Sequence, residues 1–260
     1  MNQYDLKDRV IIVTGGTSGI GEGTVRFLAE CGAKVVSASV QEDLGEKQRE
    51  TLAAEGLECV FQLTDVRDGS QVKALVDATV DRFGRLDGAF SCAGALRTGR
   101  ITNLSLDDFR LVLDVNLLGP AWLAKYALPV MERAGGGVLV FATSVAADIG
   151  FPEHSMYCAS KAALVAMIRG LTTDHSPQGI RFYGVSPGTI ETPMLAASCE
   201  GFDKPQEELY AEVAAKVPVR RLGKPIDVAR LVAFLFTEDA SFLNGCIIPV
   251  EGGTLCLPPW

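Results

Sequence analysis

The chain has few of the residues that build metal centres and disulfide frameworks. Its 260 residues include two histidines and seven cysteines, and no two cysteines stand in Cys-x-x-Cys spacing. An odd, scattered set of cysteines disfavours a disulfide framework or a zinc site, and two histidines disfavour a histidine-based metal site. We therefore expect no metal ion, and we expect the protein in the reducing cytoplasm.

Basic charge and long apolar runs are also scarce. The net charge is −8, and no uninterrupted apolar run reaches the length that spans a membrane. The first nine residues are polar and carry no signal-peptide pattern. Nucleic acids and anionic membranes need clustered basic residues. We therefore expect neither as a partner.

Apolar, β-branched runs instead alternate with helical patterns along the whole chain, which is 48% hydrophobic. This alternation predicts right-handed βαβ crossovers and an α/β fold with a single doubly wound parallel sheet, a Rossmann fold, with helices on both faces. No linker or repeat interrupts it, so residues 1–260 are expected to form one domain. The ligand of such a sheet binds beyond the carboxyl ends of its strands.

The expected elements follow from the same pattern. Strands are predicted over residues 10–13, 34–38, 59–62, 88–92, 137–143, 181–185 and 246–250. Helices are predicted over residues 20–31, 42–55, 70–83, 105–133 and 226–236, and a further helix that carries Tyr157 and Lys161 is predicted to end near Ser176. Pro120 is expected to bend the long fourth helix. Residues 189–208 show no clear period.

A glycine-rich turn, Thr14 to Gly21, follows the first predicted strand and opens the first helix. Glycines allow the backbone to approach a pyrophosphate, and amides at a helix N-terminus point at its charge. Tight turns between strands and helices use glycine for other reasons too. Its place after the first strand of a parallel sheet nevertheless favours dinucleotide binding.

Tyr157 and Lys161 stand four residues apart and share one face of a predicted helix. A phenol has a pKa near ~10, and a neighbouring ammonium favours its ionised form. We therefore expect Lys161 to lower the pKa of Tyr157, which would then exchange a proton with a substrate oxygen. Because this pair occurs by chance in many helices, the other motifs of the chain decide whether it is catalytic.

Seven motifs in one order carry a resemblance that runs nearly end to end. They are Thr14–Gly21, Ser91-Cys92-Ala93-Gly94, Asn116, Ser144 with Tyr157 and Lys161, Pro187-Gly188, Arg221–Pro225 and Glu251–Gly253. Together they resemble the short-chain dehydrogenase/reductase family. Ser91 departs from that family's Asn-Asn-Ala-Gly motif, which affects strand-end geometry more than chemistry.

The resemblance implies a nicotinamide cofactor and a set of residues that hold it. They are Gly15, Thr17, Ser18, Gly19, Ile20 and Gly21 at the turn, Ser39 after the second strand, Asp65 and Val66 at the adenine, Cys92, Ala93 and Gly94 at the adenosine and its ribose, Tyr157 and Lys161 at the nicotinamide ribose, and Pro187, Gly188, Ile190 and Thr192 at the carboxamide side.

The choice of cofactor depends on the end of the second strand. Ser39 occupies the position where an acid would bind a ribose 2′-hydroxyl and exclude a 2′-phosphate. Glu42 and Asp43 follow and would repel a phosphate. We therefore expect NAD(H) to be favoured over NADP(H).

The resemblance also implies the reaction, a hydride transfer between the cofactor and a secondary alcohol or ketone. Tyr157 would act as general acid or base, Ser144 would hold the substrate oxygen, Lys161 would orient the ribose, and Asn116 would position a water that relays protons. Residues 190–210 would form a substrate lid with a mostly apolar wall. The family commonly forms homotetramers, so we expect a homo-oligomer.

Three other readings remain open from the sequence. One is a 3-oxoacyl-(acyl-carrier-protein) reductase, which the low basic charge near the helix end at residues 174–178 disfavours. Another is a non-catalytic dinucleotide sensor, which would be free to lose Asn116, Ser144, Tyr157 or Lys161. The third is a nucleotide-sugar epimerase or dehydratase, whose Gly-x-x-Gly-x-x-Gly turn is not met because position 18 is serine.

Overall fold

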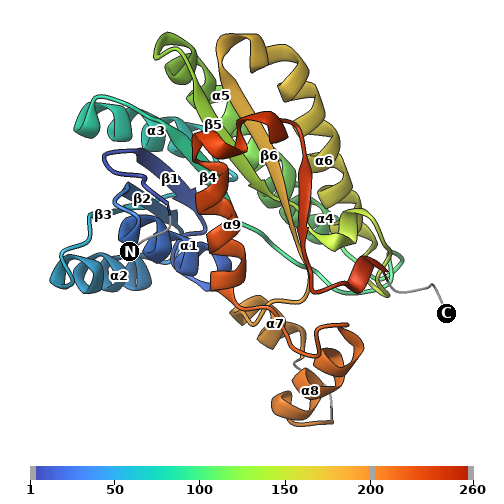
Figure 1. The fold of residues 1–260 in the computed structure, drawn as a ribbon. Helices are drawn as coiled ribbons and strands as arrows, with labels where there is room; N and C mark the ends of the chain where they lie inside the picture. Colours follow the sequence, from blue (N-terminus) through green and yellow to red (C-terminus); the bar gives the residue numbers. More distant parts are fainter. Residues whose placement is uncertain (1–3, 200–202, 257–260) are drawn as a thin grey trace.

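The computed structural model describes residues 4–199 and 203–256. The strands are β1 (Val10–Thr14), β2 (Lys34–Ser39), β3 (Cys59–Leu63), β4 (Gly88–Ser91), β5 (Gly137–Ala142), β6 (Ile180–Pro187) and β7 (Ile247–Val250). They form one sheet in the order β3-β2-β1-β4-β5-β6-β7, and every pair is parallel (Figure 1). The predicted doubly wound α/β fold is confirmed.

Nine α-helices and five shorter helical segments connect the strands in the described part of the chain. The α-helices are α1 (Gly19–Glu30), α2 (Glu42–Ala54), α3 (Gly69–Phe83), α4 (Leu106–Leu113), α5 (Gly119–Arg133), α6 (Ser155–His175), α7 (Pro193–Ser198), α8 (Gln206–Lys216) and α9 (Pro225–Leu235). The short segments are the π-helix η1 (Asp114–Leu118) and the 3₁₀-helices η2 (Val145–Ala147), η3 (Ser176–Gln178), η4 (Glu238–Leu243) and η5 (Thr254–Cys256). No described helix is long and apolar enough to span a bilayer.

Helices cover both faces of the sheet, so the central strands are apolar on both sides. All five residues of β1 are buried. Ile11 and Val13 belong to the core under α1 and α9, whereas Ile12 belongs to the core under α3, α5 and α6. Continuous burial of this kind is characteristic of a parallel sheet that is covered on both faces. These two hydrophobic cores, one on each face, hold the sheet rigidly, and the candidate site lies at the carboxyl ends of its strands.

The long helix predicted over residues 105–133 is α-helical at both ends and π-helical in its middle. Residues Asp114–Leu118 form a π-helix between α4 and α5. Pro120 lies in the first turn of α5, directly after the π-helix. A π-helical insertion, which the sequence did not predict, therefore lies just before Pro120, and such insertions often mark a functional site. The bend at Pro120 stays a prediction.

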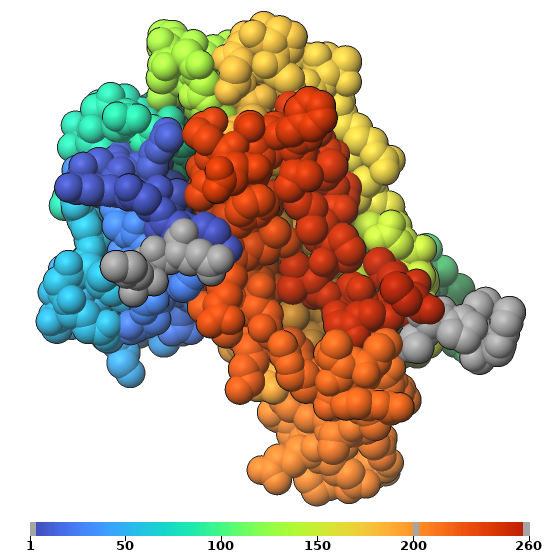
Figure 2. Space-filling view, in the orientation of Figure 1, coloured from blue at the N-terminus to red at the C-terminus, as the bar shows by residue number. Residues whose placement is uncertain are grey.

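The segment without a clear period, residues 189–208, contains α7 and the first residues of α8, and the rest of α8 follows it without having been predicted. Among positions 206–216 no residue of α8 is buried, so this helix has no apolar stripe for a sequence pattern to reveal. Figure 2 shows this part of the chain, in orange, projecting from the body of the molecule. Residues 200–202 of the predicted lid lie outside the described residues.

Strand order reverses between β1 and β4, because the chain leaves β3 at one edge and returns beside β1. Ligands of open α/β sheets bind at such a point, beyond the carboxyl ends of the strands. The glycine-rich turn follows β1, and the Cys92–Gly94 segment follows β4, so both motifs meet there.

Candidate active site

The glycine-rich turn packs too closely for side chains. A Cβ on Gly15, whose φ is +66°, would lie 2.8 Å from the Cα of Ala93, and a Cβ on Gly21 would lie 2.0 Å from the carbonyl oxygen of Gly15. Within the described residues, the Ser18 side chain caps none of the amides that open α1. These amides remain available to an anion at the helix N-terminus, so the turn fits a pyrophosphate.

Neutral side chains link this turn to the end of β2. The Thr17 hydroxyl oxygen lies 2.8 Å from Ser39 Oγ and 2.9 Å from Gln41 Oε1. Gln48 of α2 donates to the carbonyl oxygen of Gly16 at 2.7 Å. The sequence analysis missed Gln48, because a glutamine inside a helix carries no motif. The end of β2 therefore offers hydroxyl and amide groups rather than charges.

Asp65 and Val66 follow β3 at the same end of the sheet. Arg67 donates from Nε to the two carboxylate oxygens of Asp65 at 3.0 and 2.9 Å. This hydrogen bonding lowers the pKa of Asp65, against an opposing effect of partial burial. Val66 is buried against Gly119 at the start of α5. The carboxylate of Asp65 thus already has a cationic partner within the chain.

Thr14 fastens the segment after β4 to the end of β1. Its Oγ1 accepts hydrogen bonds from the amides of Cys92 at 3.1 Å and Ala93 at 3.3 Å. Burial raises the pKa of the Cys92 thiol to about 12, so this cysteine stays protonated at neutral pH. The backbone of the segment is therefore held in place where the sequence expects the adenosine and its ribose.

The beginning of the predicted lid lies over both glycine-containing segments. The Cγ2 of Thr192 is 3.0 Å from the position of a Cβ on Gly19, and the Cε of Met194 is 3.6 Å from that of Gly94. Thr192 also caps α7, accepting from the amide of Leu195 at 3.3 Å. The first turn of α7 therefore lies against both segments.

The remaining residues predicted at the carboxamide side lead into this lid. Pro187 ends β6 and is buried, and a Cβ on Gly188 would lie 2.9 Å from the Cα of Glu251. Ile190 is buried and forms an isolated parallel bridge with Gly223. The chain after β6 is thus anchored on both sides before it reaches Thr192.

The predicted catalytic residues come from β5, α6 and the π-helix. Ser144 follows β5 and caps η2, accepting from the amide of Ala146 at 3.1 Å. Tyr157 lies in the first turn of α6, and Lys161 lies one turn further, with its Nζ 5.6 Å from the Tyr157 ring centroid. Lys161 is buried and donates to the carbonyl oxygen of Ala142 at 2.8 Å.

Burial controls the protonation of this pair. Desolvation raises the pKa of Tyr157, and a hydrogen bond with Ser144 lowers it by less. Desolvation also lowers the pKa of Lys161 to about 8. The expectation that Lys161 lowers the pKa of Tyr157 is therefore wrong for the protein chain alone. The ammonium points at a backbone carbonyl instead, and the phenol stays protonated at neutral pH.

Asn116 lies in the π-helix and is fully buried. Its Nδ2 donates to the carbonyl oxygen of Ala95 at 2.9 Å and to Ser160 Oγ at 3.1 Å, and its Oδ1 accepts from the amide of Ala95 at 2.8 Å. Ser160 donates in turn to the carbonyl oxygen of Tyr157 at 2.7 Å. The sequence analysis missed Ser160, although it precedes Lys161 directly. Asn116 thereby joins the segment after β4 to α6.

His154 stands at the start of α6 beside Tyr157, with the two ring centroids 6.4 Å apart in an edge-on arrangement. Its Nδ1 lies 2.5 Å from the carbonyl oxygen of Pro152. A carbonyl can only accept, so Nδ1 carries the proton. No described group of three or more His, Cys, Asp or Glu residues could hold a metal ion.

Comparison with known proteins agrees with this architecture. A family model described as enoyl-(acyl carrier protein) reductase matches residues 15–254. The chain is 36% identical to cis-4-hydroxycyclohexanecarboxylate dehydrogenase of Sinomonas cyclohexanicum, with 95% of this chain and 96% of that protein covered. It is 35% identical to 2,5-dichloro-2,5-cyclohexadiene-1,4-diol dehydrogenase of Sphingobium indicum, with 96% and 98% covered.

A solved structure extends the likeness to the fold. The crystal structure of levodione reductase matches with a TM-score of 0.91 and 32% identity, and the match covers 97% of this chain and 99% of that one. The chain belongs to the short-chain dehydrogenase/reductase family. Like the relatives it matches, it is an oxidoreductase.

Proposed function

We propose that this protein transfers a hydride between a nicotinamide cofactor and a secondary alcohol or ketone. One observation supports it most. Ser144, Tyr157 and Lys161 come together beyond the carboxyl end of β5, and Cys92 after β4 lies close to Tyr157 and Lys161. The proposal treats residues 1–260 as one catalytic unit, with residues 190–210 as its substrate lid.

The roles of the four residues follow from their surroundings. When bound, the nicotinamide accepts or supplies the hydride. In ketone reduction the buried phenol of Tyr157 donates its proton to the substrate oxygen, and in alcohol oxidation it removes that proton. Ser144 donates a hydrogen bond to the same oxygen as charge develops on it. Lys161 holds the nicotinamide ribose, and Asn116 fixes the segment after β4 and α6 relative to each other.

NAD(H) is the proposed cofactor, favoured over NADP(H). Thr17, Ser39 and Gln41 are neutral, so they supply hydroxyl and amide groups that suit a ribose and no cation for a 2′-phosphate. The acidic first turn of α2, Glu42 and Asp43, disfavours added negative charge. We also propose that the other residues named in the sequence analysis as holding the pyrophosphate, adenine, adenosine, ribose and carboxamide contact those parts of the cofactor.

An alicyclic secondary alcohol or ketone is the proposed substrate class. The names of two relatives contain hydroxycyclohexane and cyclohexadiene-diol groups. Exposed apolar side chains surround the site here, among them Ile149, Phe151 and Met194. They offer contact to an apolar ring while Ser144 and Tyr157 meet its oxygen. A homotetramer in the cytoplasm is part of the same proposal.

The direct test is a panel of cyclic and linear secondary alcohols and ketones, with the reaction followed at the absorbance band of the reduced nicotinamide. We expect turnover of cyclohexanol-type or cyclohexanone-type compounds, with faster initial rates for NAD(H) than for NADP(H) at equal concentration. A strong preference for NADP(H) contradicts the cofactor choice. Absence of turnover with every member of the panel contradicts the substrate class.

One observation favours a second candidate. The family model that matches residues 15–254 is described as enoyl-(acyl carrier protein) reductase. An acyl-carrier substrate is acidic and needs a basic docking surface, whereas this chain has a net charge of −8. Adding an acyl-carrier-bound ketone and an acyl-carrier-bound enoyl thioester to the panel separates the two candidates.

A further inference from the structure

A cavity of about 780 Å³ opens at the amino ends of the strands, the end of the sheet opposite Tyr157 and the glycine-rich turn. Apolar residues of β1, β5, β6 and the chain after α9 line part of it, namely Ile11, Val138, Ile180 and Phe236. Its volume lies within the range of small-molecule sites, roughly 300–1,000 Å³. The proposed catalytic function makes no use of it.

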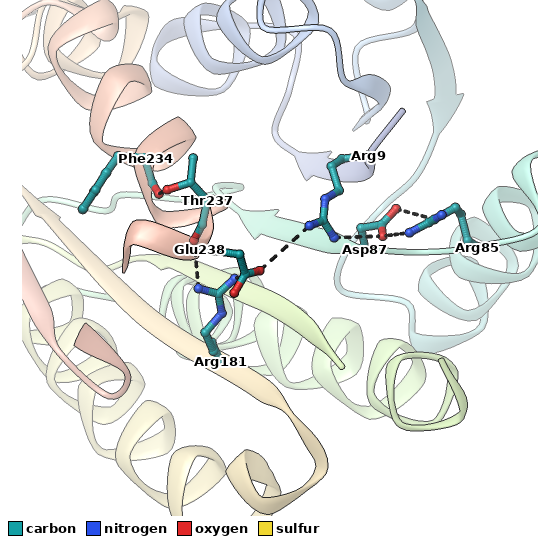
Figure 3. Close-up of polar contacts among 7 residues, drawn as sticks. All are labelled: Arg9, Arg85, Asp87, Arg181, Phe234, Thr237 and Glu238. Atoms are coloured by element: carbon teal, nitrogen blue, oxygen red, sulfur yellow. Dashed lines mark hydrogen bonds and ion pairs between the residues drawn. The ribbon is translucent and has the colours of Figure 1, made fainter. Parts of the chain in front are cut away.

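Five charged residues from distant parts of the sequence meet at this cavity. They are Arg9, Arg85, Asp87, Arg181 and Glu238. Figure 3 shows the three arginines reaching toward the two carboxylates from separate elements. Three cations and two anions leave one positive charge, in a protein whose net charge is −8. The charged side chains at the cavity therefore carry a net positive charge, although the protein as a whole is acidic.

One of the two carboxylates is fully engaged. The side chain of Asp87 is only 9% exposed and accepts from the amide of Val10 at 2.8 Å. Arg85 donates to it from Nε at 2.8 Å and from Nη2 at 2.5 Å. Asp87 is therefore held by Arg85 and by the Val10 amide, and it anchors the chain at the beginnings of β1 and β4.

The other carboxylate is exposed and is shared by two arginines. Glu238 is 75% exposed, with its Oε1 3.1 Å from Arg181 Nη2 and 3.9 Å from Arg9 Nη2. Arg181 is kept in place by donating from Nη1 to the carbonyl oxygen of Thr237 at 2.8 Å. The other contact of Arg9, to Asp87, is also long, at 3.4 Å. Arg9 and Arg181 thus face the cavity and share one exposed, displaceable anion.

We propose that this cavity binds a small dianion, a phosphate monoester or a dicarboxylate, with its acidic group between Arg9 and Arg181 in place of Glu238. Guanidinium groups bind phosphate and carboxylate oxygens through paired, charge-assisted hydrogen bonds. A phosphate monoester brings up to two negative charges to this position, where the Glu238 carboxylate brings one.

The test is calorimetric titration of the protein with inorganic phosphate and, separately, with succinate, at fixed ionic strength and with NADH present to fill the nucleotide site. We expect one binding event that weakens about tenfold in Arg9→Gln, because a charge-assisted contact is lost. We expect tighter binding in Glu238→Gln, because the competing anion is gone. Response to phosphate alone or succinate alone identifies the acidic group.

Arg110→Gln is the matched control, because Arg110 is exposed on α4 and makes a similarly long ion pair, 3.6 Å to Asp107. Absence of binding by both dianions overturns the proposal, as does equal weakening in Arg9→Gln and Arg110→Gln. If Arg9→Gln does not fold, Glu238→Gln decides, and unchanged or weaker binding there overturns the proposal.

Discussion

Lys161 donates a hydrogen bond from its buried ammonium to the carbonyl oxygen of Ala142 at 2.8 Å. Ala142 is the last residue of β5, and Ser144 follows two residues later. The contact therefore ties α6 to the strand end that presents Ser144. It also places a charged group where desolvation lowers the pKa of Lys161 to about 8.

This burial gives stability a pH dependence of known sign. In the unfolded chain the pKa of Lys161 returns to ~10.4, so between pH 8 and that value the unfolded chain binds the proton that the folded chain has lost. The free energy of unfolding therefore increases as the pH rises through this window, which means that the folded protein becomes more stable. It changes by up to ~1.4 kcal/mol per pH unit.

Comparison with Lys161→Met isolates this effect, because the other titrating groups are common to both proteins. We expect urea denaturation to show the wild type gaining ~2 kcal/mol relative to Lys161→Met between pH 7.5 and pH 9.5. Parallel changes in the two proteins would show that the ammonium is not buried.

Asn116 is predicted to contribute strongly to stability. Asn116→Ala removes three hydrogen bonds and leaves the amide and carbonyl groups of Ala95 unpaired, so we expect a loss of ~2–4 kcal/mol in the free energy of unfolding. Ser160→Ala should lose less, and the double variant should lose less than the sum because the two residues share a bond. Asn103→Ala, at an exposed position, is the control and should change little.

The glycine-rich turn supplies a steric prediction. In Gly21→Ala the new Cβ would lie 2.0 Å from the backbone oxygen of Gly15, so the turn must open. We expect the affinity for the nicotinamide cofactor to fall at least about tenfold, measured by fluorescence titration. Gly170→Ala in α6 meets no described atom within 4 Å and should leave that affinity unchanged. Equal affinities in the two variants would contradict the role of the turn.

The cap of α7 is predicted to hold the lid. Thr192→Val keeps the shape of the side chain but removes the oxygen that accepts from Leu195, a loss of about 1 kcal/mol for a helix of six residues. We expect a several-fold rise in the KM for cofactor. Thr192→Ser keeps the oxygen and loses the methyl group over Gly19, and its KM should stay near that of the wild type. A larger rise in KM for Thr192→Ser than for Thr192→Val would instead assign the effect to the methyl contact with Gly19.

Much of this architecture is predictable from the sequence, because β1 and its neighbours are apolar runs bounded by glycine-rich turns. The π-helix at Asp114–Leu118 was not predicted, since its residues continue the apolar pattern of α4 and α5. The helix α8 was missed because nothing on it is buried among the described positions. Both features depend on tertiary packing rather than on local period.

Motif spacing located the candidate site, but not its electrostatics. The spacing of Tyr157 and Lys161 predicted a lowered phenol pKa, whereas desolvation outweighs the hydrogen bond with Ser144 and raises it. The cavity at the amino ends of the strands gave no sequence signal at all. Arg9, Arg85 and Arg181 are far apart along the chain, and only the parallel sheet brings them together.

Tyr157→Phe tests the proposed chemistry most directly, because it removes one oxygen and keeps the ring beside His154 and Lys161. Turnover of an active member of the alcohol and ketone panel should fall at least about a hundredfold, as loss of a general acid or base predicts. The dissociation constant of the reduced cofactor, measured by nicotinamide fluorescence in the same preparation, should stay near the wild-type value. Turnover close to that of the wild type would contradict a proton transfer through Tyr157.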